Sequence, residues 1–150
     1  MRLLTLCWKR EADMQTKTQE IFKSNECPYK NIYQGYQKRL LFVCTAGLLR
    51  SPTCATIGAQ LGFNTRSAGS EDQYALIPVT WNLIQWANFI IFVEQKNYDE
   101  VLEKFSENEI TIGTIKEKAR VWDISDNYEY MEKMLVVKIR EKFHEQFGIS

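Results

Sequence analysis

The chain has 150 residues, of which 45% are hydrophobic and 25% are charged. This length suits one globular domain with a sizeable core and is too short for two ordinary domains. Lys plus Arg and Asp plus Glu number 19 each, so the overall charge indicates no nucleic-acid partner. The charges are uneven, because residues 1–39 carry 8 basic and 4 acidic side chains. We interpret residues 1–38 as an N-terminal extension and residues 39–150 as the domain.

The N-terminal segment has no targeting signal that we recognise. No apolar run approaches the ~20 residues of a membrane span. The apolar run in MRLLTLCWKR is about half the length that a signal peptide needs, and charged residues follow it at once. We therefore expect a cytoplasmic protein that does not bind membranes and whose cysteines are thiols. With one histidine, His144, and no Cys-x-x-Cys pair, we expect no metal and no cofactor.

Segments typical of strands and of helices alternate from residue 39 onward. Apolar runs predict four strands, at 40–44, 63–66, 89–93 and 119–124. Helical spacing predicts helices at 52–62, 79–87, 98–105 and 129–147. In the first helix, Ser51 suits the N-cap, Pro52 the first helical position and Gly62 the end. Before the domain, residues 13–23 have a helical pattern and residues 26–37 are rich in turn formers.

This alternation predicts a parallel sheet with right-handed crossovers and helices on both faces. Ligands of such folds bind at the carboxyl ends of the strands. The stretch VCTAGLLRSPTCA, residues 43–55, runs from the carboxyl end of the first predicted strand into the first predicted helix. The expected architecture therefore puts this stretch where a functional site belongs.

Cys44 and Arg50 flank that strand-to-helix junction. The backbone N–H groups between them can surround an oxyanion at the positive end of the helix dipole. Arg50 can bind two oxygens of the anion, and Ser51 can donate a hydrogen bond that helps to keep Cys44 a nucleophilic thiolate. The candidate anion-binding residues are Thr45, Ala46, Gly47, Leu48, Leu49 and Ser51.

The spacing Cys-x5-Arg alone is a weak signal, because chance produces it often. The apolar strand before it and the Ser-Pro-Thr and helix after it make it far more specific. A buried structural thiol is the alternative interpretation of Cys44.

A phosphoester also needs an acid that protonates the leaving oxygen and then activates water. The segment WDISDNYEY, after the fourth predicted strand, offers Asp126 and, nearer to the strand, Asp123. Either aspartate has the alternative role of a turn former. Tyr128 and Tyr130 follow, and with Leu48 they are candidate walls for an aromatic phosphoester.

With these stretches together, residues 39–148 resemble the low-molecular-weight protein tyrosine phosphatases. The matching segments are LLFVCTAGLLRSPT, TRSAGS, WANFIIFVE and DISDNYEYM, the last similar to the acid loop of a bacterial and phage-type branch. The resemblance implies one doubly wound domain with a four-stranded parallel sheet of order 2-1-3-4. It also implies a nucleophile at Cys44, a phosphoryl-binding Arg50, a general acid at Asp126 and supporting roles for Ser51 and Ser67.

The chain departs from that family at three positions. Gly47 stands where the family usually has an asparagine that anchors the loop, and Leu49 stands where many members have a second cysteine. Ser125 replaces a common proline in the acid loop. We therefore expect a less rigid loop that cannot be protected by a disulfide within it.

The predicted function is hydrolysis of phosphomonoesters, of the phosphotyrosine type, through a phosphocysteine on Cys44. The expected partner is a phosphorylated protein or a small phosphoester, whereas the oligomeric state is not predicted. A thioredoxin-coupled arsenate reductase shares the fold and loop but needs further downstream cysteines, and none follows Cys54. A non-catalytic phosphate-binding or interaction module is the third hypothesis.

Overall fold

The computed structural model describes residues 37–149. The predicted helix at 13–23 and all but one residue of the turn-rich segment at 26–37 lie outside this range, and the domain boundary at residue 38 stays a prediction. No helix of the described part is long and apolar enough to cross a membrane.

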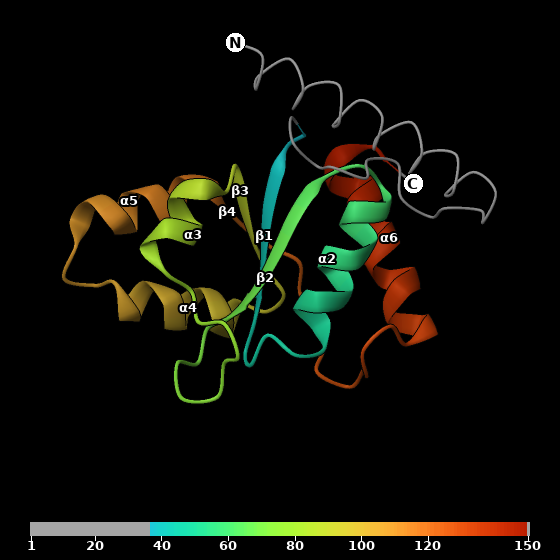
Figure 1. The fold of residues 1–150 in the computed structure, drawn as a ribbon, viewed down its shortest axis with the longest axis horizontal. Helices are drawn as coiled ribbons and strands as arrows, with labels where there is room; N and C mark the ends of the chain where they lie inside the picture. Colours follow the sequence, from blue (N-terminus) through green and yellow to red (C-terminus); the bar gives the residue numbers. More distant parts are fainter. Residues whose placement is uncertain (1–36, 150) are drawn as a thin grey trace, which may run out of the picture.

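The core of the fold is a four-stranded sheet in which every pairing is parallel. Its strands lie in the order β2-β1-β3-β4, which confirms the predicted topology. They are β1 (Arg39–Cys44), β2 (Asn64–Gly69), β3 (Phe89–Phe92) and β4 (Ala119–Val121). Because β1 is central, its carboxyl end is flanked on one side by β2 and on the other by β3 (Figure 1).

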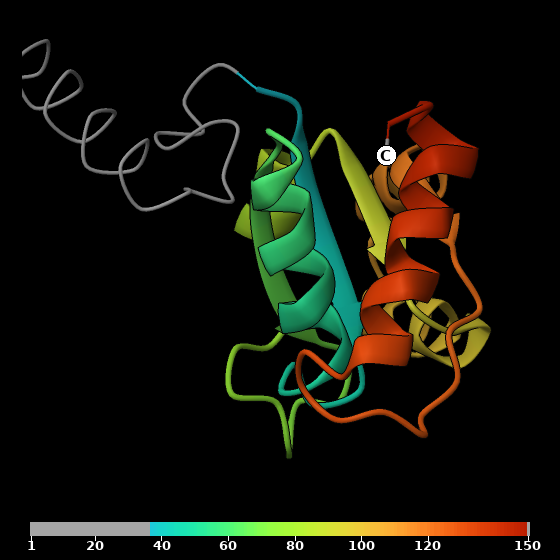
Figure 2. The same cartoon turned by 90° about the vertical axis from the view of Figure 1, so that its right-hand side faces the viewer.

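Helices cover both faces of the sheet, as predicted. One face carries α2 (Arg50–Gln60) and α6 (Lys133–Phe147), which pack against each other (Figures 1 and 2). The other face carries α3 (Trp81–Trp86), α4 (Gln95–Lys104) and α5 (Glu109–Lys118). The chain after β4 crosses below the strand ends before α6 begins, and so brings residues 122–132 near the start of α2 (Figure 2).

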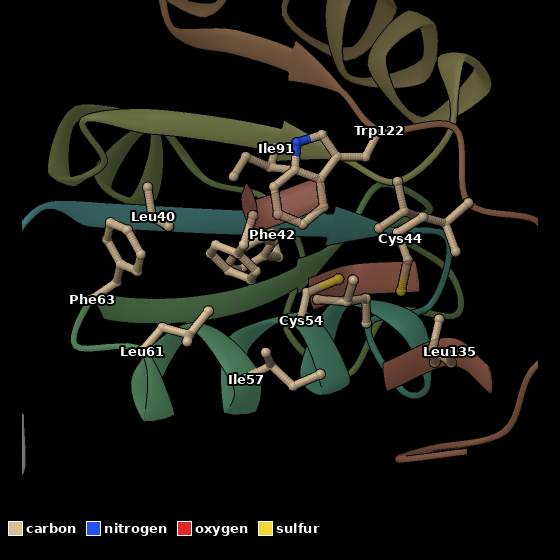
Figure 3. Close-up of a cluster of buried hydrophobic side chains, with 14 residues drawn as sticks. Leu40, Phe42, Cys44, Cys54, Ile57, Leu61, Phe63, Ile91, Trp122 and Leu135 are labelled. Carbon is tan, nitrogen blue, oxygen red and sulfur yellow. The ribbon is translucent and has the colours of Figure 1, made fainter. Parts of the chain in front are cut away.

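Alternation along β1 divides its side chains between two hydrophobic clusters. Leu40, Phe42 and Cys44 belong to the cluster under α2 and α6, which Figure 3 shows. Leu41 and Val43 belong to the cluster under the other three helices. All five are buried, since a central parallel strand is covered on both faces.

Several local predictions differ from the structure. Strand β4 ends at Val121 rather than at 124, α4 begins at Gln95 rather than at 98, and α6 begins at Lys133 rather than at 129. Helix α2 begins two residues earlier than predicted, with Leu49 as its N-cap, so Ser51 lies inside the helix and caps nothing. Strand β2 continues to Gly69, beyond the predicted end at 66. Helix α5 was not predicted, because only Thr111 and Ile115 of its residues are buried and the apolar periodicity is correspondingly weak.

Candidate active site

The segment between β1 and α2 forms a tight loop against the segment that follows β2. Three consecutive loop carbonyls accept backbone hydrogen bonds: Cys44 O from Ser70 N (2.8 Å), Thr45 O from Glu71 N (3.1 Å) and Ala46 O from Leu76 N (3.3 Å). In a trans peptide the N–H points away from the C=O. The N–H groups that follow these carbonyls are therefore directed away from the 70–76 segment, and that of Gly47 donates to Cys44 Sγ.

Gly47 occupies the bend of this loop with φ +72°. A Cβ at this position would lie 3.1 Å from both the carbonyl carbon of Ala68 and the nitrogen of Gly69. The left-handed conformation and the close approach to β2 both favour glycine.

Cys44 lies beneath the loop with only 3% of its surface exposed. Its Sγ accepts a hydrogen bond from Gly47 N at 3.1 Å and lies 3.0 Å from Ser51 Oγ. The Ser51 hydroxyl also lies 3.3 Å from the carbonyl oxygen of Ala68. Two polar groups from the loop and the helix therefore reach the sulfur, which a purely structural thiol does not need.

Arg50 is buried at the first position of α2. Its Nη1 donates to a Glu94 carboxylate oxygen and to the carbonyl oxygen of Ile124, the latter at 3.0 Å. Its Nη2 lies 3.1 Å from Asp126 Oδ1. The guanidinium thus connects the loop to both the end of β3 and the segment after β4.

The two candidate acids occupy different surroundings. Asp126 reaches Arg50, and 66% of its side chain is exposed, so it has room to approach a substrate. Asp123 is also exposed, and its backbone adopts φ +54°, in the left-handed region that aspartate tolerates in turns. The geometry thus brings Asp126 beside the arginine, while Asp123 has the backbone of a turn residue.

The candidate substrate walls are not all gathered at the loop. Leu48 and Leu49 are 51% and 42% exposed at its rim. Tyr128 packs against the hydrophobic cluster under α2 and α6, and Lys138 Nζ lies 5.5 Å from its ring centre. The Tyr130 hydroxyl lies 3.4 Å from Thr56 Oγ1, in the second turn of α2. Tyr130 thus contacts α2, whereas Tyr128 contacts the hydrophobic cluster and Lys138 of α6.

A second polar network supports the loop from behind, and the sequence analysis missed it. Asn97, fully buried in the first turn of α4, donates from Nδ2 to Thr45 Oγ1 (3.2 Å) and to Ser70 Oγ (3.0 Å). Ser70 in turn donates to Glu100 Oε2 at 2.6 Å. The serine of this network is Ser70. The supporting role expected for Ser67, which pairs with Phe42 in the sheet, stays a prediction.

Cys54 lies in α2, one turn after Arg50. It belongs to the same hydrophobic cluster as Cys44 (Figure 3). Burial raises the pKa of the Cys54 thiol well above its ordinary value, and the neighbouring Cys44 raises it further. Cys54 is thus a protonated core thiol. Within residues 37–149, no group of three or more His, Cys, Asp or Glu side chains is arranged to hold a metal ion.

Solved structures that superpose on this chain include tyrosine and arginine phosphatases. The low-molecular-weight protein tyrosine phosphatase SP-PTP from Streptococcus pyogenes superposes with a TM-score of 0.57 at 13% identity, over 73% of this chain and 93% of that one. The tyrosine phosphatase Wzb from Escherichia coli K30, in complex with phosphate, gives 0.53 at 13% identity, over 73% and 99%. The YwlE arginine phosphatase from Geobacillus stearothermophilus gives 0.50 at 21% identity, over 69% and 84%.

No model of a known protein family and no curated protein sequence matches the chain. The chain has the fold of the low-molecular-weight protein tyrosine phosphatases, which confirms the predicted fold class and the resemblance at the level of the fold.

Proposed function

We propose that this protein is a cysteine-dependent phosphatase that hydrolyses phosphomonoesters. The observation that carries the proposal is the arrangement at the carboxyl end of β1: the Cys44 sulfur has two hydrogen-bond partners, Gly47 N and Ser51 Oγ, and Arg50 begins the helix that follows the loop and pairs with Asp126. Similarity to phosphatase structures supports it. Phosphotyrosine is the proposed substrate type, because the exposed Leu48 and Leu49 border the loop.

In the first step, the Cys44 thiolate attacks phosphorus, and the bond from phosphorus to the ester oxygen breaks. The loop N–H groups and Arg50 stabilise the charge that develops on the other phosphoryl oxygens. Asp126 donates a proton to the departing oxygen. The product is a phosphocysteine and a free alcohol or phenol.

In the second step, water attacks the phosphocysteine. Asp126, now ionised, takes a proton from that water, and the sulfur leaves as the thiolate. Inorganic phosphate is released, and Asp126 and Cys44 return to their starting states. The Gly47 N–H and the Ser51 hydroxyl stabilise the thiolate both before the attack and as it departs.

Arsenate reduction receives no support from Cys54, because a buried thiol with a raised pKa is a poor attacking group for a Cys44 adduct. The cysteines at positions 7 and 27 lie outside the described residues.

The test is hydrolysis of an aryl phosphate in the presence of a metal chelator. We expect the wild type to turn over, Cys44→Ser to lose about 10⁴-fold or more, and the matched variant Cys54→Ala to keep its activity. Equal rates for wild type and Cys44→Ser would show that the assignment is wrong. A panel that adds phosphotyrosine peptides, alkyl phosphates and phosphoarginine distinguishes the substrate types.

A further inference from the structure

The end of the sheet that carries the candidate active site is acidic. The segments between each strand and the next helix contain seven acidic side chains and no basic one. These segments are residues 45–49, 70–80, 93–94 and 122–132. Arg50, the first residue of α2, is therefore surrounded by loops of negative charge.

The opposite end of the sheet, where the strands begin, is basic (Figure 1). The residues there contain six basic side chains and one acidic one, Glu117; they are residues 37–39, 61–66, 87–89 and 116–120. The six basic side chains are called the basic end: Lys38, Arg39, Arg66, Lys116, Lys118 and Arg120. The domain is thus polarised along the direction of its strands.

Three side chains of the basic end meet at the last turn of α3. Arg39 Nε donates to the carbonyl oxygen of Trp86, and Lys118 Nζ donates to those of the two residues before it, at 2.8 and 3.3 Å. The Arg66 guanidinium carbon lies 4.5 Å from the centre of the Trp86 ring. Cations at the last carbonyls stabilise a helix, so part of this arrangement has a structural role.

Two further cations of the basic end lie over Phe89. Lys38 Nζ is 5.3 Å and Arg120 Cζ is 5.0 Å from the centre of its ring. Phe89 packs against the cluster under α2 and α6, whereas Trp86 packs against the cluster under the other three helices. The basic end therefore extends over both faces of the sheet. A ring attracts a cation by its face, but it carries no net charge and does not neutralise it.

The positive charge of the basic end is not balanced by the described carboxylates. The ion pairs within residues 37–149 involve none of its six side chains. Burial lowers the pKa of Lys118 below its ordinary value, and neighbouring Arg39 lowers it further, against the opposite effect of Glu117. A bound polyanion would reduce this repulsion between like charges.

The spread of the cations indicates the shape of that polyanion. Arg66 lies on β2, Arg39 on β1 and Arg120 on β4, so the row crosses three strand spacings and is about 14 Å long. This length exceeds a single phosphate or carboxylate group and matches about four residues of an extended peptide. The partly buried rings of Trp86 and Phe89 offer apolar contact beside the cations. A long nucleic acid fits less well, because it would also meet the acidic end.

We propose that the basic end binds an acidic segment of a partner protein. The segment lies across the beginnings of the strands, with its Asp and Glu carboxylates beside the basic side chains. Strand β1, with 6 residues, separates the basic end from the candidate active site by about 20 Å. Binding there uses neither Cys44 nor Arg50, so the inference stands independently of the proposed phosphatase function.

The test is binding of a fluorescein-labelled peptide of eight glutamates to the full chain, measured by fluorescence anisotropy at low salt. We expect wild type to bind the peptide, and to bind it more weakly as the salt concentration rises. Arg66→Gln/Arg120→Gln should bind it about tenfold more weakly, because both side chains are exposed and two charges are lost. Lys96→Gln/Lys133→Gln removes two exposed charges at the starts of α4 and α6; it is the matched control and binds like wild type.

Activity and folding are measured on the same variants. The kcat and KM of Arg66→Gln/Arg120→Gln for an aryl phosphate stay unchanged, because both side chains lie at the other end of the sheet, and thermal melting shows that each variant is folded. If wild type hydrolyses esters and does not bind the peptide, this proposal fails and the phosphatase proposal stands. If it binds the peptide and hydrolyses no ester, the reverse holds.

Full affinity in a folded Arg66→Gln/Arg120→Gln protein would overturn the proposal. A loss in Lys9→Gln/Arg10→Gln instead would assign the peptide to the basic N-terminal segment. An oligothymidylate of eight nucleotides, or vesicles that contain anionic phospholipid, should bind more weakly than the peptide at the same salt concentration. Equal or tighter binding of either one would show that the class of partner is wrong.

Discussion

The surroundings of Cys44 and Cys54 differ, although both thiols are buried in the same hydrophobic cluster (Figure 3). Cys44 ends a strand beneath a loop, where Gly47 N and Ser51 Oγ reach its sulfur. Cys54 lies inside α2, and burial raises the pKa of its thiol. Low exposure therefore does not separate a candidate nucleophile from a core thiol in this protein. The polar groups directed at the sulfur of Cys44 distinguish it from the core thiol of Cys54.

The largest expected effect concerns Asp126, the proposed acid, which lies 3.1 Å from Arg50 Nη2. Asp126→Asn keeps the shape of the side chain and removes its proton, so turnover of substrates with poor leaving groups should fall by roughly 10²–10⁴-fold. Steady-state kinetics with aryl and alkyl phosphates measure this loss, which should be smaller for good leaving groups. Asp123→Asn is the matched control, and a larger loss in that variant would transfer the role to Asp123.

The next effect is the reactivity of the two thiols in the folded protein. At neutral pH, iodoacetamide should modify Cys44 at least about 10²-fold faster than Cys54, because the thiolate is the reactive form. Phosphate should slow the modification of Cys44. Peptide mass spectrometry after timed quenching resolves each of the four cysteines. Comparable rates at the two sites would remove the distinction between them.

The smallest effect is on stability at high pH. The pKa of Cys54 is raised in the folded state above its ordinary value of 9.0, so its contribution to stability is present below that pH and is lost above it. Between about pH 7 and pH 10, the free energy of unfolding should fall more steeply in wild type than in Cys54→Ala, by at most about 1.4 kcal/mol per pH unit. Denaturant titrations across this range measure the difference. Identical slopes would mean that burial does not raise the pKa of the Cys54 thiol in the folded protein.

Much of the fold was predictable because its signals are local. The apolar runs of the strands and the helical periodicity around them are visible within a few residues, and from them follow the sheet and the position of Cys44 at a strand end. Helix α5 was missed for the same reason, since only two of its residues face the core.

The parts of the candidate site that were missed depend on contacts between distant segments. Glu94 meets Arg50 across 44 positions of the chain, and Asn97 meets Thr45 across 52. Glu94 and Asn97 both follow β3, and no sequence motif at either residue identifies its partner. The N-cap role predicted for Ser51 was wrong because its hydroxyl contacts Cys44 and Ala68, which lie on two different strands.

The three loop carbonyls bonded to residues 70–76 have a consequence for motion. The loop cannot open while those bonds persist, so its opening requires the segment after β2 to detach as well. The two segments form one cooperative unit of local unfolding, in the sense of hydrogen exchange. An anion bound by the loop therefore also slows the exchange of the amides at Ser70, Glu71 and Leu76, none of which needs to touch it.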